Sequence, residues 1–375
     1  MKKKRKRHLW VCIGLALVFL ALCAPAAAAL TPEEIPGRLR EILPDAARQT
    51  LPEELGAENS EEVSRAVGIR AVLASLLSIL QGELPGSIGV LLSLLGVTVF
   101  FAVGGVLRSD SPGENGEMCD RIITVAASLA MLHILGNIAG DVVSYLGDIV
   151  TMTNGMAPLY GALYAAGGSA ATAVTSSATL TLMGTVLQNA CAGVLLPLVR
   201  VSFGLMLAGN IGRGVPTESI GRQVRSVYTT LLALICTLMT ASLAFQTTLT
   251  SGSDSIAGRA AKFAFGSIPL VGGTVNATLQ TLSASLSYLK GLIGAAAYVS
   301  VLLLALPPLI RLYLVHIALD LCASAAGALG SSRGERLFRD TRGIVDMLLA
   351  VVIVSALMMI LSLTVFSKCA TALLQ

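Results

Sequence analysis

The most regular feature of the chain is a series of apolar runs, separated by short polar or arginine-rich stretches. A helix that crosses a bilayer needs about 20 mostly apolar residues. Runs of about that length occupy residues 86–107, 122–143, 178–199, 226–249, 291–310 and 344–366. The pattern predicts an all-α polytopic membrane protein with about six transmembrane helices.

Composition supports a location in the lipid bilayer. Hydrophobic residues make up 54% of the chain and charged residues 13%, with a mean hydropathy of +0.79. Soluble domains carry about 25% charged residues, so this apolar excess is too large for one soluble core. Much of the net charge of +4 lies in the first eight residues, which leaves no basic face for nucleic acid. We therefore expect an integral membrane protein with no nucleic-acid partner.

The N-terminus has the three parts of a secretory signal peptide. Residues 2–7 are all lysine or arginine, residues 9–22 are apolar, and residues 26–29 are alanines suited to cleavage. This order predicts a signal peptide over residues 1–29, with an uncleaved first membrane helix as the alternative.

Between the predicted signal peptide and the first span lies a more polar stretch. Residues 30–85 begin with an acidic, proline-punctuated segment and end in a helical pattern at 66–84 that suits an interfacial or partner-packed helix. If the signal peptide is cleaved, this segment lies outside the cytoplasm. The polytopic membrane domain is expected to follow over residues 86–375.

Two groups of arginines orient the predicted helices. One loop contains Arg213, Arg222 and Arg225, and another contains Arg333, Arg336, Arg339 and Arg342. Loops rich in lysine and arginine stay in the cytoplasm. A chain that starts outside and crosses six times places both groups inside and the C-terminus outside.

Two glycine-rich apolar segments, 156–177 and 260–275, fit none of the six spans. The second contains Lys262, Pro269, Gly272 and Gly273, and the first contains Gly167 and Gly168. Irregular backbone at membrane depth is tolerated where protein or a water-filled cavity surrounds it. We interpret both segments as re-entrant or broken helices, with a full span over 156–177 as the alternative. These six residues are candidates for lining a path or for close packing.

A short internal echo suggests a duplication. The sequence Pro-Leu-Val-Arg that ends at Arg200 recurs as Pro-Leu-Ile-Arg ending at Arg311. Each copy follows a Gly-Gly segment and an apolar helix, and each precedes an arginine-rich loop. The order predicts parallel repeats over residues 155–250 and 262–367, in which Arg200 and Arg311 are equivalent candidate site residues.

Signatures of catalysis and of metal or nucleotide binding are lacking in the sequence. No phosphate-binding GxxxxGK[ST] is present, and the GxSxG match at 330–334 has no strand before it. The cysteines after the signal peptide are scattered and show no metal-binding spacing. We therefore expect no enzymatic activity, no cofactor and no metal.

Two histidines have polar neighbours one turn away. His133 is followed by Asn137 within a predicted span, which favours a hydrogen bond between helices. His316 and Asp320 are four residues apart, which favours a local bond on one helix face and leaves a proton-handling pair as the alternative.

Three motifs carry a resemblance to a known family. The sequence AKFAFGSIPLVGG at 261–273 is preceded by Asp254 and Arg259, and NGMAPLYGALYAAGG and LLPLV occur at 154–168 and 195–199. The chain resembles stage III sporulation protein AE, a polytopic membrane protein of endospore-forming bacteria. The resemblance covers nearly the whole chain.

The resemblance implies a role in spore formation. It implies a membrane subunit of the channel or secretion-like apparatus that links mother cell and forespore and is needed for forespore development after engulfment. The implied location is the mother-cell membrane around the forespore. The implied partners are the other stage III sporulation A membrane proteins and, through the complex, stage II sporulation protein Q. A stand-alone secondary transporter for a small solute is the alternative, because broken helices and repeats would suit a transporter's central site.

Overall fold

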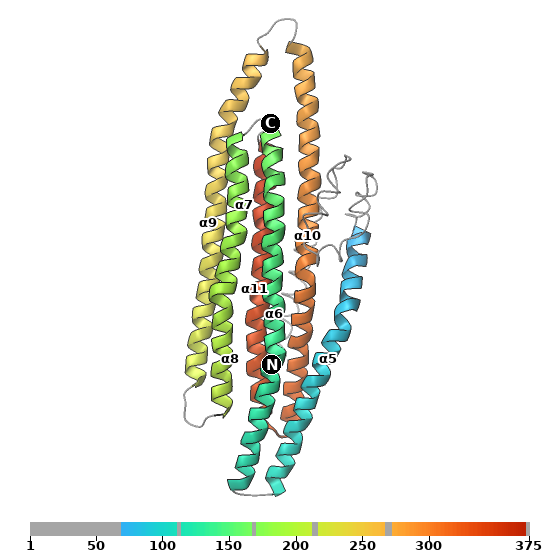
Figure 1. The fold of residues 1–375 in the computed structure, drawn as a ribbon, viewed down its shortest axis with the longest axis vertical. Helices are drawn as coiled ribbons and strands as arrows, with labels where there is room; N and C mark the ends of the chain where they lie inside the picture. Colours follow the sequence, from blue (N-terminus) through green and yellow to red (C-terminus); the bar gives the residue numbers. More distant parts are fainter. Residues whose placement is uncertain (1–68, 111–113, 167–169, 212–216, 267–271, 373–375) are drawn as a thin grey trace.

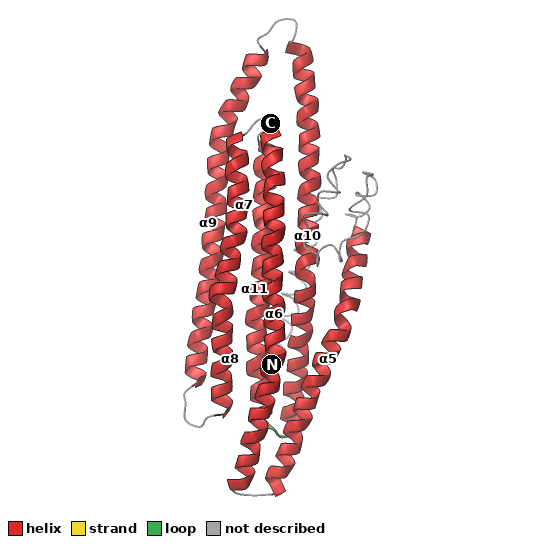
Figure 2. Cartoon of the chain, viewed as in Figure 1, coloured by secondary structure: helices red, strands yellow, loops and turns green. Residues whose placement is uncertain are grey.

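The structure, a computed structural model, describes residues 69–110, 114–166, 170–211, 217–266 and 272–372. These residues form long helices that run side by side along one axis (Figure 1), and no strand occurs among them (Figure 2). The helices are α5 (Ile69–Asp110), α6 (Glu114–Ala166), α7 (Ala170–Ala190), the π-helical turn η3 (Cys191–Leu195), α8 (Leu196–Ile211), α9 (Thr217–Gly266), α10 (Gly272–Ala328) and α11 (Ser332–Ala372). The predicted all-α architecture is confirmed.

Six crossings of the bundle follow from this order. Within the described residues, the segments long and apolar enough to span a membrane are Leu77–Gly104, Arg121–Ala162, Ala173–Gly209, Ser219–Ala244, Ala297–Ala328 and Ser332–Phe366. Each overlaps one of the six predicted spans, and η3 joins α7 and α8 into a single crossing. The six apolar helices expected from the sequence are therefore confirmed.

Two groups of arginines lie toward one end of the bundle. The end of α8 and the start of α9 lie toward the same end as the turn between α10 and α11 (Figure 1). Arg222 and Arg225 belong to the first turns of α9, and Arg333 and Arg336 to those of α11. The C-terminus lies toward the opposite end (Figure 1). By the positive-inside rule we expect the arginine-rich end to be the cytoplasmic one.

The helices are longer than a bilayer requires. The apolar part of α6 alone, Arg121–Ala162, has 42 residues. At 1.5 Å per residue it extends for roughly 63 Å, about twice the hydrocarbon thickness of about 30 Å. The apolar part of α6 is therefore longer than the hydrocarbon core of one flat bilayer.

Side-chain contacts fix the relative heights of the helices. Residues 332–346 of α11, its polar segment, carry most of its charges, and an apolar stretch follows from Met347 to Phe366. The Tyr228 hydroxyl on α9 donates to the Met347 carbonyl, and the Tyr164 hydroxyl on α6 donates to the Phe366 carbonyl at 2.5 Å. The second half of α6 therefore runs beside the apolar stretch of α11.

The end of α5 and the start of α6 lie lower, at the height of the polar segment of α11. Phe101 of α5 packs edge-on against Phe338 of α11, with ring centroids 6.3 Å apart. Ile123 of α6 in turn lies against Gly104 of α5, where a Cβ would approach its side chain to 2.4 Å. These contacts place the end of α5 and the start of α6 beside the polar segment of α11, toward the arginine-rich end.

The helix predicted at 66–84 is joined to the first span. From Ile69 onward the structure contains one helix, α5, which passes through Pro85 without ending. Pro85 is exposed, so its ring lies on the open face of the helix. The helix loses the one backbone hydrogen bond that the proline nitrogen cannot donate, and it continues on both sides. Residues 1–68, which include the predicted signal peptide, lie outside the described residues.

The two glycine-rich segments are only partly described. Residues 156–166 and 170–177 are helical in α6 and α7, and residues 260–266 and 272–275 are helical in α9 and α10. Gly167, Gly168 and Pro269 lie outside the described residues, so the re-entrant interpretation stays a prediction. The repeat also stays a prediction, although α8 and α10 run in the same direction as it requires (Figure 1).

Candidate functional site

The strongest polar feature inside the bundle is an ion pair between α10 and α6. Arg311 Nη1 lies 2.6 Å from Asp141 Oδ2, and the two side chains are 32% and 39% exposed. Both residues belong to segments apolar enough to span a membrane. Charged side chains at such positions are costly unless paired, and they commonly mark functional sites.

A second carboxylate from α5 joins this pair. Glu83 is partly buried and interacts electrostatically with both Arg311 and Asp141. Two carboxylates thus share one guanidinium, and the group carries a surplus negative charge when all three are ionised. The Arg311 Nε is buried and has no hydrogen-bond acceptor among the described residues. The site can therefore accept a further polar group or a cation.

Two more charged contacts join α10 to α11 below this group. His316 Nδ1 lies 2.6 Å from Asp346 Oδ1, and Asp320 Oδ1 lies 2.5 Å from Arg342 Nη1. The two helices are antiparallel, so residues four apart on one meet residues four apart on the other. The Tyr313 ring stacks on His316 with centroids 6.3 Å apart.

The expected local bond between His316 and Asp320 is therefore wrong. Both side chains face α11, where His316 contacts Asp346 and Asp320 pairs with Arg342. Each of the two side chains on α10 thus has its partner on the neighbouring helix and not one turn away on its own helix. His133 shows the reverse outcome, since Asn137 contacts it at 3.4 Å within α6 on an exposed face rather than across helices.

These residues form a charged layer, which is defined by Glu83, Asp141, Arg311, His316, Asp320, Arg342 and Asp346. The layer draws on α5, α6, α10 and α11 and lies where α11 changes from polar to apolar. It therefore separates the second half of α6, which faces apolar α11, from the end of α5 and the start of α6.

Packing around the layer is close where glycine permits it. The Arg225 guanidinium of α9 lies so near Gly343 of α11 that a Cβ there would be 2.0 Å from Nη2. Nearby, the buried Tyr228 ring fixes α9 to α11 through its bond to Met347. The absence of a side chain at Gly343 thus lets a cation rest on the α11 backbone beside Arg342.

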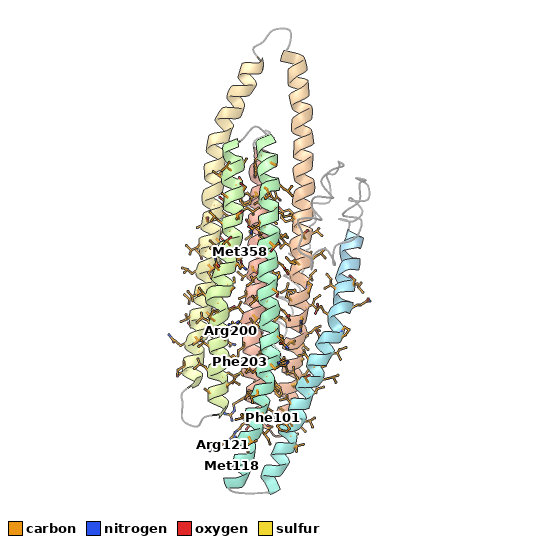
Figure 3. The ribbon with its side chains drawn as sticks, in the orientation of Figure 1. Phe101, Met118, Arg121, Arg200, Phe203 and Met358 are labelled. Atoms are coloured by element: carbon orange, nitrogen blue, oxygen red, sulfur yellow. The ribbon has the colours of Figure 1, made fainter. Side chains whose placement is uncertain are left out.

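The residues predicted as site candidates are distributed over the whole molecule. Arg311 lies in the charged layer, whereas Arg200 is exposed on α8, between Phe203 and Met358 along the bundle axis (Figure 3). Lys262 is near the end of α9, and Gly272 and Gly273 begin α10. The structure does not test a path or packing role for the glycine-rich segments.

Glu83, Asp141 and Asp346 were missed by sequence reasoning. The available signal was a single acidic residue inside or at the edge of a long apolar run, opposite in charge to Arg311 in another run. Which runs are neighbours could not be read from one sequence, so the pairing stayed hidden. No group of three or more possible metal ligands occurs among the described residues.

The six apolar crossings and the charged layer between them define a polytopic α-helical membrane protein. A family model described as stage III sporulation protein AE matches residues 57–370. This match covers most of the chain, so the protein belongs to that family, as its motifs predicted. A search of curated proteins and a search of solved structures found no match to the chain.

Proposed function

We propose that the protein is a membrane subunit of the apparatus that links mother cell and forespore during sporulation. The observation that carries the proposal is the family match over residues 57–370 of a chain with six apolar crossings. The proposed location is the mother-cell membrane that surrounds the forespore. The proposed partners are the other stage III sporulation A membrane proteins and, through them, stage II sporulation protein Q.

In this proposal the chain contributes structure or a conduit rather than catalysis. Its long helices extend beyond a bilayer, which suits contact with other subunits on either side of the membrane. The charged layer supplies fixed polar contacts within the bundle, where lipid would not hold helices together. No cofactor is needed for such a role.

The experiment is a deletion in a sporulating host with complementation by a fluorescent fusion. Development should stop after engulfment, and the fusion should concentrate in the membrane around the forespore. Normal spore yield from the deletion strain, or uniform fluorescence in the whole cell envelope after engulfment, would contradict the proposal.

A stand-alone secondary transporter is the second candidate. The observation that favours it is the Glu83–Asp141–Arg311 group, because transporter sites place ionisable side chains at membrane depth. The purified protein reconstituted alone in liposomes separates the two candidates. Solute uptake driven by a proton or sodium gradient would support the transporter. Loss of that uptake in Arg311→Gln would show that transport depends on the Glu83–Asp141–Arg311 group.

A further inference from the structure

Three buried hydroxyls near one end of the bundle have no hydrogen-bond partner. Other buried hydroxyls donate to a carbonyl of their own helix, as Thr153 does to Ile149 at 2.6 Å. The hydroxyl oxygens of Tyr160, Ser176 and Ser362 are buried and make no such bond to any described residue. These three residues are 2%, 1% and 2% exposed, so lipid and bulk solvent do not reach them in this conformation.

Contacts between α6 and α11 bring two of these hydroxyls to one level. The centroid of the Tyr160 ring lies 6.4 Å from that of the Phe366 ring, and the Tyr164 hydroxyl donates to the Phe366 carbonyl. Ser362 precedes Phe366 by four residues, so it lies one turn away on the same face of α11. Tyr160 also interacts electrostatically with Tyr298 of α10. Hydroxyl-bearing side chains of α6, α10 and α11 therefore meet at this level.

Ser176 of α7 lies at the same level. A Cβ at Gly161, the residue after Tyr160, would be 3.4 Å from the Ser177 Cβ and 3.5 Å from the Ala173 carbonyl oxygen. Ser176 precedes Ser177 in the chain, and its burial shows that it faces the inside of the bundle. We define Tyr160, Ser176 and Ser362 as the hydroxyl cluster.

The hydroxyl cluster lies where three apolar segments end. These segments are Arg121–Ala162, Ala173–Gly209 and Ser332–Phe366, and each cluster residue lies within about one turn of Ala162, Ala173 or Phe366. The ends concerned lie toward the C-terminus, opposite the arginine-rich turns (Figure 1). Water beyond the apolar part of the bundle is therefore a short distance away.

We propose that the hydroxyl cluster binds internal water between α6, α7 and α11. A buried hydroxyl without a partner is costly, because it has given up its hydrogen bonds to water and gained none in return. Buried waters typically make about three hydrogen bonds to polar groups that are otherwise unsatisfied, and the cluster offers three hydroxyls from three helices. Each hydroxyl can donate or accept, so the cluster suits either orientation of a water molecule. Its members are uncharged, which fits a neutral ligand rather than an ion.

Radiolytic footprinting of the purified protein tests the proposal. A short X-ray pulse produces hydroxyl radicals from water, and inside a closed bundle they arise only where water is bound. Mass spectrometry should find Tyr160 and Phe366 oxidised about tenfold faster than Tyr228. Tyr228 is the matched control, since it is 1% exposed and its hydroxyl donates to the Met347 carbonyl.

A pair of serine variants on α11 assigns the oxidation to the cluster. Ser362→Ala removes one of the hydroxyls that hold the water, so it should slow oxidation of Tyr160 and leave Tyr228 unchanged. Ser355→Ala is the control, because Ser355 is equally buried and its hydroxyl already donates to the Val352 carbonyl at 3.0 Å. It should leave oxidation of Tyr160 as in the natural protein.

A stability measurement provides an independent test through its sign. Tyr160→Phe keeps the ring and removes the hydroxyl. Loss of a hydroxyl that is bonded to water should lower the denaturing-detergent concentration at the unfolding midpoint, whereas loss of an unpaired buried hydroxyl should raise it. The proposal predicts the lower midpoint. Tyr228→Phe, which loses a bond to a carbonyl, should lower the midpoint in either case and calibrates the measurement.

Four results would overturn the proposal. Oxidation of Tyr160 and Phe366 as slow as that of Tyr228 would show that no water is bound there, and a raised midpoint in Tyr160→Phe would show the same. Equally fast oxidation of Tyr228 would mean that bulk water enters the whole bundle. An unchanged rate at Tyr160 in Ser362→Ala would place the water elsewhere. The measurements need no sporulating cell, so their failure would leave the proposed function untouched.

Discussion

Phe101 of α5 meets Phe338 of α11 edge-on, with ring centroids 6.3 Å apart, and both rings are buried. The contact joins the last turn of the apolar segment of α5 to the polar beginning of α11. It shows that the apolar runs of this chain are not all at one height. Gly334 of α11 lies against the same ring, where a Cβ would come within 3.0 Å of Phe101 Cγ, so the approach depends on a glycine.

The first prediction concerns topology. The starts of α9 and α11 lie toward the same arginine-rich end, and the C-terminus lies toward the other (Figure 1). Reporter fusions after residues 215, 255, 335 and 375 should therefore read inside, outside, inside and outside. A fusion at residue 375 that reads inside would contradict the six-crossing topology.

The second prediction concerns close packing of α6 against α7. A Cβ at Gly184 would lie 3.0 Å from Thr153 Cγ2, and Thr153 is fully buried and branched at Cβ. Gly184→Leu should therefore destabilise the bundle by about 1–3 kcal/mol through overpacking. The measurement is unfolding in mixed micelles by a titration with denaturing detergent.

Gly140 provides the matched control for that experiment. It is exposed on α6, and a Cβ there would meet nothing within 4 Å. Gly140→Leu should be neutral or slightly stabilising, since leucine favours the helix over glycine by up to about 1 kcal/mol. Equal destabilisation by both variants would mean that the α6–α7 contact is not the cause.

The third prediction concerns the Arg311–Asp141 ion pair. Arg311→Gln leaves Asp141 and Glu83 without a cation and should lower stability, whereas Asp141→Asn should lower it less, because Glu83 still interacts with Arg311. The double variant should lose less than the sum, with a coupling on the order of 1 kcal/mol because both side chains are about one-third exposed. Strict additivity in a double-mutant cycle would show that the pair contributes no interaction energy.

The fourth prediction concerns the glycine-rich segment at 260–275. Gly272→Leu or Gly273→Leu should abolish spore formation after engulfment while the protein still inserts, because glycine alone tolerates both close approach and unusual φ angles. Lys262→Ala should do less harm if that lysine only reaches to the interface. Spore counts and membrane-fraction immunoblots test this, and normal yield at normal protein levels would reject the segment as a site.

The sequence was sufficient for the number and order of the apolar helices, and the membrane side of each helix end stays a prediction. Each depends on a local quantity, namely a run of about 20 apolar residues or a group of arginines. It was insufficient for helix lengths, because polar residues that face a neighbouring helix, such as Asp320 against Arg342, do not end a helix. The predicted spans therefore ended at polar residues that lie inside longer helices in the structure.

The charged layer could be predicted only in part. Arg311 was singled out through its sequence echo with Arg200, but its partner Asp141 lies 170 positions earlier. Periodicity along one helix identifies a face and leaves open which helix covers it. His316 and Asp320 illustrate the limit, since the spacing that suggested a mutual bond in fact aligns both with α11.

The most direct test of the proposed function is isolation of the protein from sporangia after engulfment. A C-terminal affinity tag, extraction in mild detergent and quantitative mass spectrometry would measure which proteins accompany it. The account predicts strong enrichment of the other stage III sporulation A membrane proteins and of stage II sporulation protein Q over a tagged, unrelated membrane protein. Recovery of the protein without any of these partners, from cells that sporulate normally with the tagged copy, would contradict it.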